Sequence, residues 1–468
     1  MTSSEPSATQ SYDPPVSDAL AVFMSDGWDS ALTKPARMDV SDRTAQRRQQ
    51  VSAAFNGKRL VIPAGAPPRR SGDQAYRFRP ESDHVWLTGI GEQHSILVID
   101  GSLPEGAALY RLDGGRRDTD EFWRSRTRGE FWNGRRLAHS VVEYMTGIPC
   151  RDLDEVSTML TPDTVVLRGV SAHVDRSVSV SPDDADLARV LSDLRLIKDD
   201  HEIAELTAAV EITMRGFDDV VAQWAQVREH GERWIEGTFA RRARLEGNGV
   251  GYASIAAAGS HATSLHWIDN SGSVPDDQLV LMDMGVEAHS LYTADITRTI
   301  PANGVFSDAQ RVVYEIVERA QDAGMAAVRP GAKFRAFHHA ATDVLVRGLN
   351  DLGLLPCSVD EALDPESQVY RRWTLCGTGH MLGLDVHDCG NATFDRYPEG
   401  ELAQGHVLTV EPGLYFQEDD LLVPPELRGV GIRIEDDLVV TAQGSVNLSA
   451  ALPRTVPDIE SWFSSSGS

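Results

Sequence analysis

Residues 374–388, TLCGTGHMLGLDVHD, carry two histidines, His380 and His387, among small and apolar residues. Acidic residues on both sides of this stretch can complete a site with them. Each of these acidic residues lies in or at the end of an apolar, strand-like run, and the four are Asp283, Asp295, Glu411 and Glu435. A charge buried in such a run is costly unless a cation or hydrogen bonds compensate it. A metal site accounts for all of these residues at once.

The composition limits the function classes that the chain can belong to. The chain has 468 residues and a formal net charge of -26, and this length allows two or more domains with full-sized cores. Nucleic-acid binders carry a basic footprint, so the acidic balance argues against a nucleic-acid partner. Four cysteines form no C-x-x-C pair, which argues against a disulfide framework and structural zinc. We find no secretory leader and no apolar run near the ~20 residues of a membrane span, so we expect no membrane association and a cytoplasmic location.

The chain is expected to have three parts, which are an N-terminal extension (1–40), an α/β domain (41–185) and a C-terminal α+β domain (186–468). The second boundary lies where SVSPDDADLARV, residues 179–190, gives a start signal for a connecting helix. Within the first domain, the apolar runs VWLTGI (85–90) and SILVI (95–99) predict two strands.

The C-terminal part alternates predicted helices and strands. Apolar residues spaced by three or four predict one long helix over residues 199–227. These residues are Ile203, Leu206, Val210, Met214, Phe217, Val221 and Trp224. A second helix is expected after Ser307, where Gln310 can complete a capping box, and a third over residues 332–352. The strands that hold the carboxylates lie between and after these helices, so we expect an α+β domain with a mainly antiparallel sheet.

Strand geometry predicts how the acidic residues converge. In GIRIEDD, residues 431–437, side chains alternate between two faces, so Arg433 and Glu435 share the polar face. Asp283 and Asp295 meet if their segments pair as neighbouring strands. Together with Glu435, Glu411 and the His380 imidazole, the two aspartates form an oxygen-rich donor set. This set suits a pair of Mn²⁺ ions better than a structural zinc, although Co²⁺ or Zn²⁺ can also occupy it.

Two histidines outside the metal set are candidates for the substrate side. Two metals ~3.5–4 Å apart would lower the pKa of a shared water and polarise a carbonyl for hydrolysis. His266 and His387 can then donate to that carbonyl or to the developing oxyanion. The alternatives are a structural pair of His387 with Asp388 and a core position for His266 beside Trp267. We favour the functional interpretation for both histidines.

The order of these residues and the strings around them resemble a known family. The strings are YTADITRT (292–299), GHMLGLDVHD (379–388), VEPGLY (410–415) and GIRIEDD (431–437). They are similar to those of the pita-bread metallopeptidases of family M24B, and more narrowly to aminopeptidase P (Xaa-Pro aminopeptidase) and its relative prolidase. YRFRPESDHVWLTGI (76–90) and FWNGRR (131–136) are similar to the N-terminal domain of aminopeptidase P. The resemblance implies an aminopeptidase P-type N-terminal domain and a pita-bread catalytic domain.

The resemblance also implies an activity, namely hydrolysis of the N-terminal Xaa-Pro bond of peptides with proline at the second position. Two Mn²⁺ ions would be held by Asp283, Asp295, His380, Glu411 and Glu435. A metal-bridging hydroxide would attack the carbonyl before proline, with Glu411 assisting proton transfer. The substrate side would be lined by His266, His387 and Arg433. Tyr252 would orient a metal ligand without binding the metal itself. Relatives are often dimers or tetramers, so we expect a homo-oligomer.

Two features depart from the family pattern. Asp283 and Asp295 are twelve residues apart, where relatives commonly have eleven, so we expect one extra residue in the turn. Cys376 stands where aminopeptidase P usually has a substrate-side histidine, and we expect a small buried side chain there. A thiol cannot replace an imidazole as a hydrogen-bonding group, so Cys376 is predicted to weaken activity. The alternatives are a prolidase confined to Xaa-Pro dipeptides, an impaired pita-bread binding protein, and a metal-free amidinohydrolase of the creatinase type, which the ligands argue against.

Overall fold

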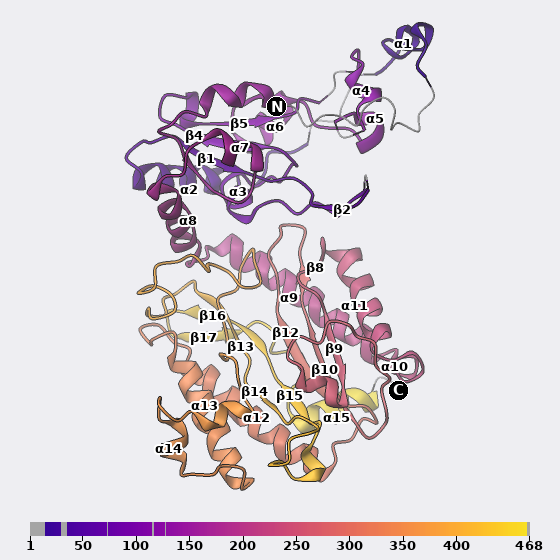
Figure 1. The fold of residues 1–468 in the computed structure, drawn as a ribbon, viewed down its shortest axis with the longest axis vertical. Helices are drawn as coiled ribbons and strands as arrows, with labels where there is room; N and C mark the ends of the chain where they lie inside the picture. The colour runs from indigo at the N-terminus through magenta and orange to yellow at the C-terminus, as the bar shows by residue number, and fades with distance from the viewer. Residues whose placement is uncertain (1–14, 30–34, 73, 115–116, 127, 466–468) are drawn as a thin grey trace. The chain divides into compact units, whose positions relative to one another are not determined.

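The computed structural model describes residues 15–29, 35–72, 74–114, 117–126 and 128–465 (Figure 1). Residues 1–14 and 30–34 of the predicted N-terminal extension therefore lie outside the described residues. The chain divides into two compact units, Met1–Leu187 and Ala188–Ser468. Among the described residues, no helix is long and apolar enough to cross a bilayer.

A five-stranded mixed sheet forms the centre of the first unit. Its spatial order is β6 (Cys150–Asp152), β5 (Ala107–Arg111), β4 (Ile96–Ile99), β1 (Leu60–Pro63) and β7 (Val165–Val166). β4 runs antiparallel to β1 and β5, whereas β6 and β7 run parallel to β5 and β1. The predicted strand at residues 95–99 is thus present as β4. Residues of β1 and β4 are all buried, as expected for the central strands of a covered sheet.

Short helices and a hairpin complete this unit. The helices are α1 (Asp18–Met24), α2 (Ser41–Ala54), α3 (Ser82–Thr88), α4 (Glu121–Arg124), α5 (Glu130–Asn133), α6 (His139–Thr146) and α7 (Ala172–Ser177). The hairpin pairs β2 (Arg69–Ser71) with β3 (Gln74–Ala75). Helix α8 (Pro182–Arg195) begins within the predicted start signal and leads into the second unit.

The strand predicted at residues 85–90 is wrong, because most of these residues belong to helix α3. Glu81 caps this helix by accepting a hydrogen bond from the His84 amide at 2.9 Å. Gly89 ends it in the left-handed conformation, with φ of 73°. A short apolar run is compatible with a strand or with a buried helix, and here the two caps decide for the helix.

The second unit is built from antiparallel strands and longer helices. Its strands are β8 (Gly249–Val250), β9 (Ile255–Ala258), β10 (Leu279–Met284), β11 (Val286–Glu287), β12 (Ile296–Pro301), β13 (Val407–Val410), β14 (Gly413–Tyr415), β15 (Gly431–Arg433), β16 (Asp436–Thr441) and β17 (Gly444–Asn447). They form the sheets β12-β10-β9 and β13-β16-β17 and the pairs β11-β8 and β14-β15. Each of these pairings is antiparallel. The predicted α+β class with mainly antiparallel strands is confirmed for this unit.

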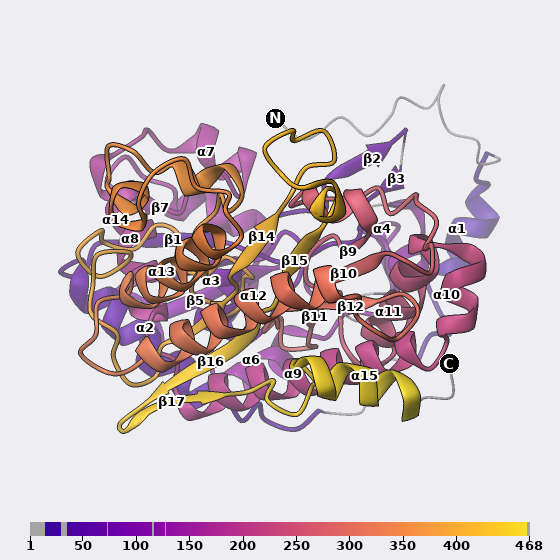
Figure 2. The same cartoon turned by 90° about the horizontal axis from the view of Figure 1, so that it is seen from below.

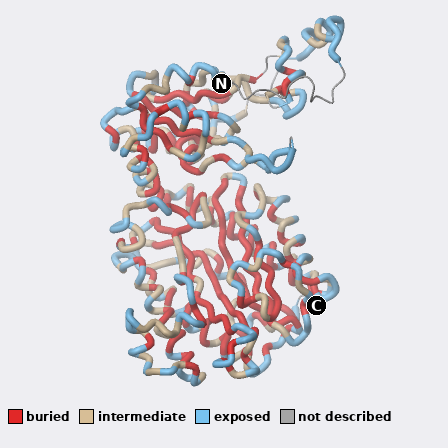
Figure 3. The backbone as a smooth tube through the Cα atoms, in the orientation of Figure 1, coloured by how far each residue is buried: buried red, intermediate tan, exposed pale blue. Residues whose placement is uncertain are grey.

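Helices cover these strands. They are α9 (Asp200–Val221), α10 (Trp224–His230), α11 (Glu232–Glu246), α12 (Asp308–Ala327), α13 (Ala336–Asp351), α14 (Val359–Leu363) and α15 (Val456–Ser465). α11 packs on β8 and β9, while α12 packs on α13 and on the strands β13, β14 and β15 (Figures 1 and 2). Apart from β8 and β17, the strands are almost entirely buried, whereas the helices alternate buried and exposed positions (Figure 3). The strands therefore form a rigid interior on which site residues can be placed.

The long helix predicted over residues 199–227 is two helices. α9 ends at Val221, Gln223 is non-helical with φ of -110° and ψ of 25°, and α10 starts at Trp224. The Trp224 indole donates to the Ala302 carbonyl at 2.7 Å, so this side chain stays in the core although the helix is interrupted. The predicted capping box of α12 is present.

Candidate active site

Every side chain predicted for the site lines one cavity of about 300 Å³ in the second unit. These side chains are Tyr252, His266, Asp283, Asp295, Cys376, His380, His387, Glu411, Arg433 and Glu435. They come from segments that are up to 183 residues apart in sequence, from Tyr252 to Glu435. The fold therefore brings the whole predicted set to one place.

The two aspartates converge through strand pairing. Asp283 lies in β10 opposite Thr297 of β12, and Asp295 directly precedes β12. The Tyr252 hydroxyl lies 2.7 Å from one oxygen of Asp283 and 2.5 Å from one oxygen of Asp295. Burial raises the pKa of Tyr252 well above its usual value, and the two aspartates add to this effect. The phenol therefore stays protonated and can act as a hydrogen-bond donor. Tyr252 thus fixes the spacing of the two carboxylates.

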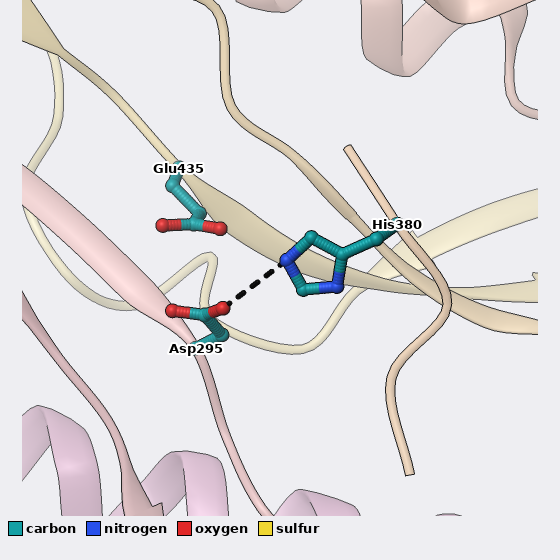
Figure 4. Close-up of side chains that lie close together, drawn as sticks. All are labelled: Asp295, His380 and Glu435. Atoms are coloured by element: carbon teal, nitrogen blue, oxygen red, sulfur yellow. Dashed lines mark ion pairs between the residues drawn. The ribbon is translucent and has the colours of Figure 1, made fainter. Parts of the chain in front are cut away.

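Three ligand atoms form the densest part of the site. One atom each of Asp295, His380 and Glu435 lies within 4.8 Å of the other two. The His380 Nε2 atom lies 3.4 Å from Asp295 and 3.4 Å from Glu411. Figure 4 shows Asp295 and Glu435 facing the same edge of the His380 ring. Asp283 instead accepts a hydrogen bond from Arg433 at 2.5 Å, so its second oxygen is engaged by a cationic side chain.

The backbone explains why His380 faces the carboxylates. The His380 amide donates to the Thr409 hydroxyl at 3.1 Å, and the Thr409 amide donates to the His380 carbonyl at 2.9 Å. Met381 forms an antiparallel bridge to Leu408 of β13. Glu411 follows directly after β13, so the same strand positions both His380 and the Glu411 carboxylate.

The electrostatics show that Arg433 and His380 compensate the carboxylates of the cluster only in part. Burial raises the pKa of Glu435 well above its usual value and that of Glu411 to about 7, with neighbouring carboxylates adding to the effect. Burial alone would lower the pKa of His380, but Asp295 and Glu411 raise it to about 9. Asp283 also has a raised pKa, from burial, although Arg433 opposes this. Like charges confined in a buried site shift in this way unless positive charge is added.

The donor set fits a divalent metal. Glu435 accepts from the Thr297 hydroxyl through one oxygen at 2.7 Å, while its other oxygen is buried and has no hydrogen-bond partner among the described residues. An orphaned buried carboxylate oxygen beside an imidazole and further carboxylates is a ready cation ligand. Of the predicted ligands, Asp295, His380 and Glu435 are already clustered closely enough to share one ion.

Arg433 contacts both a carboxylate of the cluster and other residues of the cavity wall. Besides Asp283, it donates to the Thr297 hydroxyl at 3.1 Å and to the Tyr415 hydroxyl at 3.0 Å. Tyr415 also lines the cavity, and sequence reasoning did not single it out although it ends the quoted string VEPGLY. Three protein partners hold the guanidinium in place, so Arg433 is pre-positioned rather than mobile.

The exposed part of the cavity wall includes the three predicted residues His266, Cys376 and His387. His266 and His387 are both exposed, and the His387 ring meets the His380 ring edge-on at a centroid distance of 4.4 Å. Burial lowers the pKa of His387, which favours the neutral imidazole at neutral pH. Cys376 is exposed, so the expectation of a buried side chain there is wrong. Partial burial and the Glu411 carboxylate raise the pKa of its thiol, which stays protonated.

Comparisons with known proteins show the family to which the chain belongs. The family model described as Metallopeptidase family M24 matches residues 204–442, which is just over half of the chain. The chain belongs to this family. A second family model, described as Aminopeptidase P, N-terminal domain, matches residues 44–165 of this M24 peptidase.

Curated relatives extend over nearly the whole M24 chain. Xaa-Pro aminopeptidase 2 of Streptomyces coelicolor is 47% identical over 459 residues, covering 96% of this chain and 97% of its own. The Xaa-Pro aminopeptidase of Escherichia coli is 32% identical over 449 residues, covering 90% and 98%. The similarity therefore includes both units of the chain.

Solved structures show the same architecture. Pseudomonas aeruginosa aminopeptidase PepP matches with a TM-score of 0.81 and 28% identity, covering 92% of this chain and all of that chain. Aminopeptidase P from Escherichia coli with the inhibitor Pro-Leu matches with a TM-score of 0.78 and 29% identity, covering 90% and 99%. The predicted pita-bread catalytic domain and aminopeptidase P-type N-terminal domain are confirmed. The chain is a metallo-aminopeptidase of the M24 family.

Proposed function

We propose that this chain is a dimetal, manganese-dependent Xaa-Pro aminopeptidase. The observation that carries the proposal is a single cavity in which a buried carboxylate–imidazole cluster faces exposed histidines and a fixed arginine. The similarity to Xaa-Pro aminopeptidases along the whole chain supports the same substrate class. Proline calls for a dedicated enzyme because its tertiary amide has no N–H and fixes φ.

The five predicted ligands would hold two Mn²⁺ ions, with Co²⁺ or Zn²⁺ as alternatives. These ligands are Asp283, Asp295, His380, Glu411 and Glu435. When bound, the ions would supply a hydroxide as the nucleophile and Lewis acidity toward the scissile carbonyl. Tyr252 does not bind the ions itself. Its hydroxyl, which stays protonated, orients the carboxylates of Asp283 and Asp295.

Glu411 is the side chain best placed to move a proton. Burial raises the pKa of Glu411 to about 7 in the metal-free site, and bound cations would favour its carboxylate form, which can accept a proton from a water. Its neighbour His380 is 3.4 Å away and stays with the ligand cluster. We assign to Glu411 the transfer of a proton from the attacking water to the departing proline nitrogen.

The substrate side is formed by three side chains with different roles. His387, largely neutral, can donate one ring N–H to the carbonyl oxygen before proline. His266 is exposed on the same cavity and can hold the substrate backbone or the developing oxyanion. Arg433 carries a fixed positive charge beside the anionic cluster, which favours a substrate carboxylate or carbonyl approaching from the open side.

Cys376 supports a second candidate function, an impaired pita-bread binding protein. Its thiol lines the cavity but offers only a weak donor, and its raised pKa keeps it uncharged. The third candidate is a prolidase, which differs by rejecting peptide beyond the proline. The homo-oligomeric state and the cytoplasmic location remain predictions, and light scattering tests the first of them.

A peptide panel tests the proposed function. The Mn²⁺-loaded protein is given Gly-Pro, Gly-Pro-Leu and the matched peptide Gly-Ala-Leu, and released residues are followed by mass spectrometry. An aminopeptidase of this type releases glycine from Gly-Pro-Leu but not from Gly-Ala-Leu. Release from Gly-Pro alone identifies a prolidase, and no release from any peptide by metal-loaded protein supports the binding protein.

A further inference from the structure

Glu232 is a buried carboxylate that lies outside the metal cluster. It occupies the first position of α11, where the helix dipole favours a negative charge. Its side chain is 0% exposed, and a charge without water is stable only when hydrogen bonds compensate it. Four donors reach its two oxygens, so the acceptor sites of the carboxylate are filled.

All four donors come from one segment, residues 258–272. One Glu232 oxygen accepts from the Ala258 amide at 2.8 Å and from His261 Nδ1 at 2.8 Å. The other accepts from the Trp267 indole at 2.9 Å and from the Gly272 amide at 2.6 Å. The Glu232 amide in turn donates to the Gly272 carbonyl at 3.0 Å. A single side chain thus fixes both ends and two interior points of this segment.

Further contacts make the segment stiff. The His261 and Trp267 rings stack at a centroid distance of 3.9 Å with an interplanar angle of 21°. The Asn270 side chain accepts from the Ala256 amide at 2.8 Å and donates to the Ser254 carbonyl at 2.9 Å. These bonds are buried, where hydrogen bonds are strong and costly to leave unmade.

Three side chains of this segment line the cavity, Leu265, His266 and Ile268, and of these His266 is the one that can hydrogen-bond through its side chain. It lies next to Trp267, whose ring is directed to Glu232, and its own side chain lines the cavity. Within the described part of the chain, the His266 ring has no side-chain or backbone hydrogen bond. Its position therefore depends on the backbone of the segment, and that backbone is held by Glu232.

We propose that Glu232, acting through His261 and Trp267, is a positioning residue that holds His266 in place for the substrate. This inference rests on the proposed function, because His266 has a role only if the cavity binds and cleaves a peptide. Glu232 touches neither the predicted ligands nor the cavity surface. Its replacement should therefore change the rate of cleavage without changing the metal content.

The test is a double-mutant cycle with the full-length, Mn²⁺-loaded protein. Glu232→Gln keeps the shape but turns one acceptor oxygen into a donor that faces two donors. We expect kcat for Gly-Pro-Leu to fall about tenfold or more, with KM changed less than about threefold. In a His266→Ala background the same replacement should change kcat by less than about twofold, because the residue through which it acts is gone.

Controls separate positioning from general destabilisation. Glu246→Gln makes the same chemical change at the other end of α11, where Arg215 and Arg242 hold the carboxylate, and should leave kcat unchanged. Trp267→Phe keeps the ring and removes one donor, so it tests the same network if Glu232→Gln does not fold. It should lower kcat by about threefold to tenfold, and again only when His266 is present.

Hydrogen exchange gives a readout independent of activity. In Glu232→Gln, the amides of Ala258 and Gly272 should exchange about tenfold or more faster, with the change confined to residues 258–272. Equal losses of kcat with and without His266 would refute the positioning role, as would unchanged kcat and unchanged exchange. If the wild-type protein cleaves no peptide, the proposed function fails instead, and local exchange alone then decides whether Glu232 holds the segment.

Discussion

Asp388, next to the candidate substrate residue His387, should be a main contributor to the stability of the second unit. It is 2% exposed and pairs with Lys198 at 3.0 Å and with Arg195. Burial alone would raise its pKa, but the two cations lower it from 3.8 to about 2. A pKa difference of this size corresponds to about 2.4 kcal/mol of folding free energy.

The sign of the pH dependence follows from the lowered pKa. The native carboxylate holds its proton less tightly than the unfolded one, so the contribution is fully present above about pH 4 and is lost as the pH falls toward about 2. Asp388→Asn removes the anion and leaves Lys198 buried without its partner. We expect a loss of about 3 to 5 kcal/mol at neutral pH, the usual effect of breaking a buried pair.

Urea unfolding of the metal-free protein, followed by tryptophan fluorescence, measures this loss. Asp343→Asn is a matched control, because Asp343 pairs with Arg347 on the surface, where side chains are 43% and 60% exposed. It should cost less than about 1 kcal/mol. The double variant Asp388→Asn with Lys198→Met should cost less than the two single losses combined. If Asp388→Asn lowers the free energy of unfolding no more than the control does, the buried pairing of Asp388 is not a main contributor to stability.

Three further predictions concern the cavity. Tyr252→Phe removes the hydroxyl that contacts Asp283 and Asp295, and it should weaken Mn²⁺ binding about tenfold to a hundredfold in calorimetry. Unchanged affinity would contradict the proposed role of Tyr252 in orienting these carboxylates. Cys376→His should raise kcat/KM for Gly-Pro-Leu, because an imidazole restores a strong donor on the cavity wall, and an unchanged or lower rate would show that the thiol is no defect. Metal affinity should fall as the pH drops from about 8 to about 6, since protons compete at Glu411, with a pKa of about 7, and at His380, with a pKa of about 9. Calorimetry in buffers of different ionisation enthalpy should detect the released protons, and pH-independent binding would exclude this competition.

The sequence predicted the convergence of the site well because strand rules are local. Alternation in residues 431–437 placed Arg433 and Glu435 on one face, and both line the cavity. Asp283 and Asp295 were expected to meet through neighbouring strands, and β10 pairs with β12 as required. The period of two in a strand and the pairing of adjacent strands are readable from sequence without knowledge of the rest of the fold.

Other features depend on contacts that are distant in sequence. Glu232 reads as an ordinary acidic residue at a helix start, and its donors lie 26 to 40 residues further along the chain. The sequence places Asp388 beside His387, but its cationic partners Arg195 and Lys198 are 190 or more residues away. The exposure of Cys376 likewise depends on how its loop leaves the strands. Burial and partner choice at such positions are set by the tertiary structure, which local patterns do not contain.

We expect the buried carboxylate–imidazole cluster to act as a two-metal centre for cleavage before proline. The most direct measurement is the rate of glycine release from Gly-Pro-Leu as chelated protein is titrated with Mn²⁺. We expect no release without metal and a rate that saturates at two ions per chain. Release that is unaffected by chelation, or no release at saturating metal, would contradict this expectation.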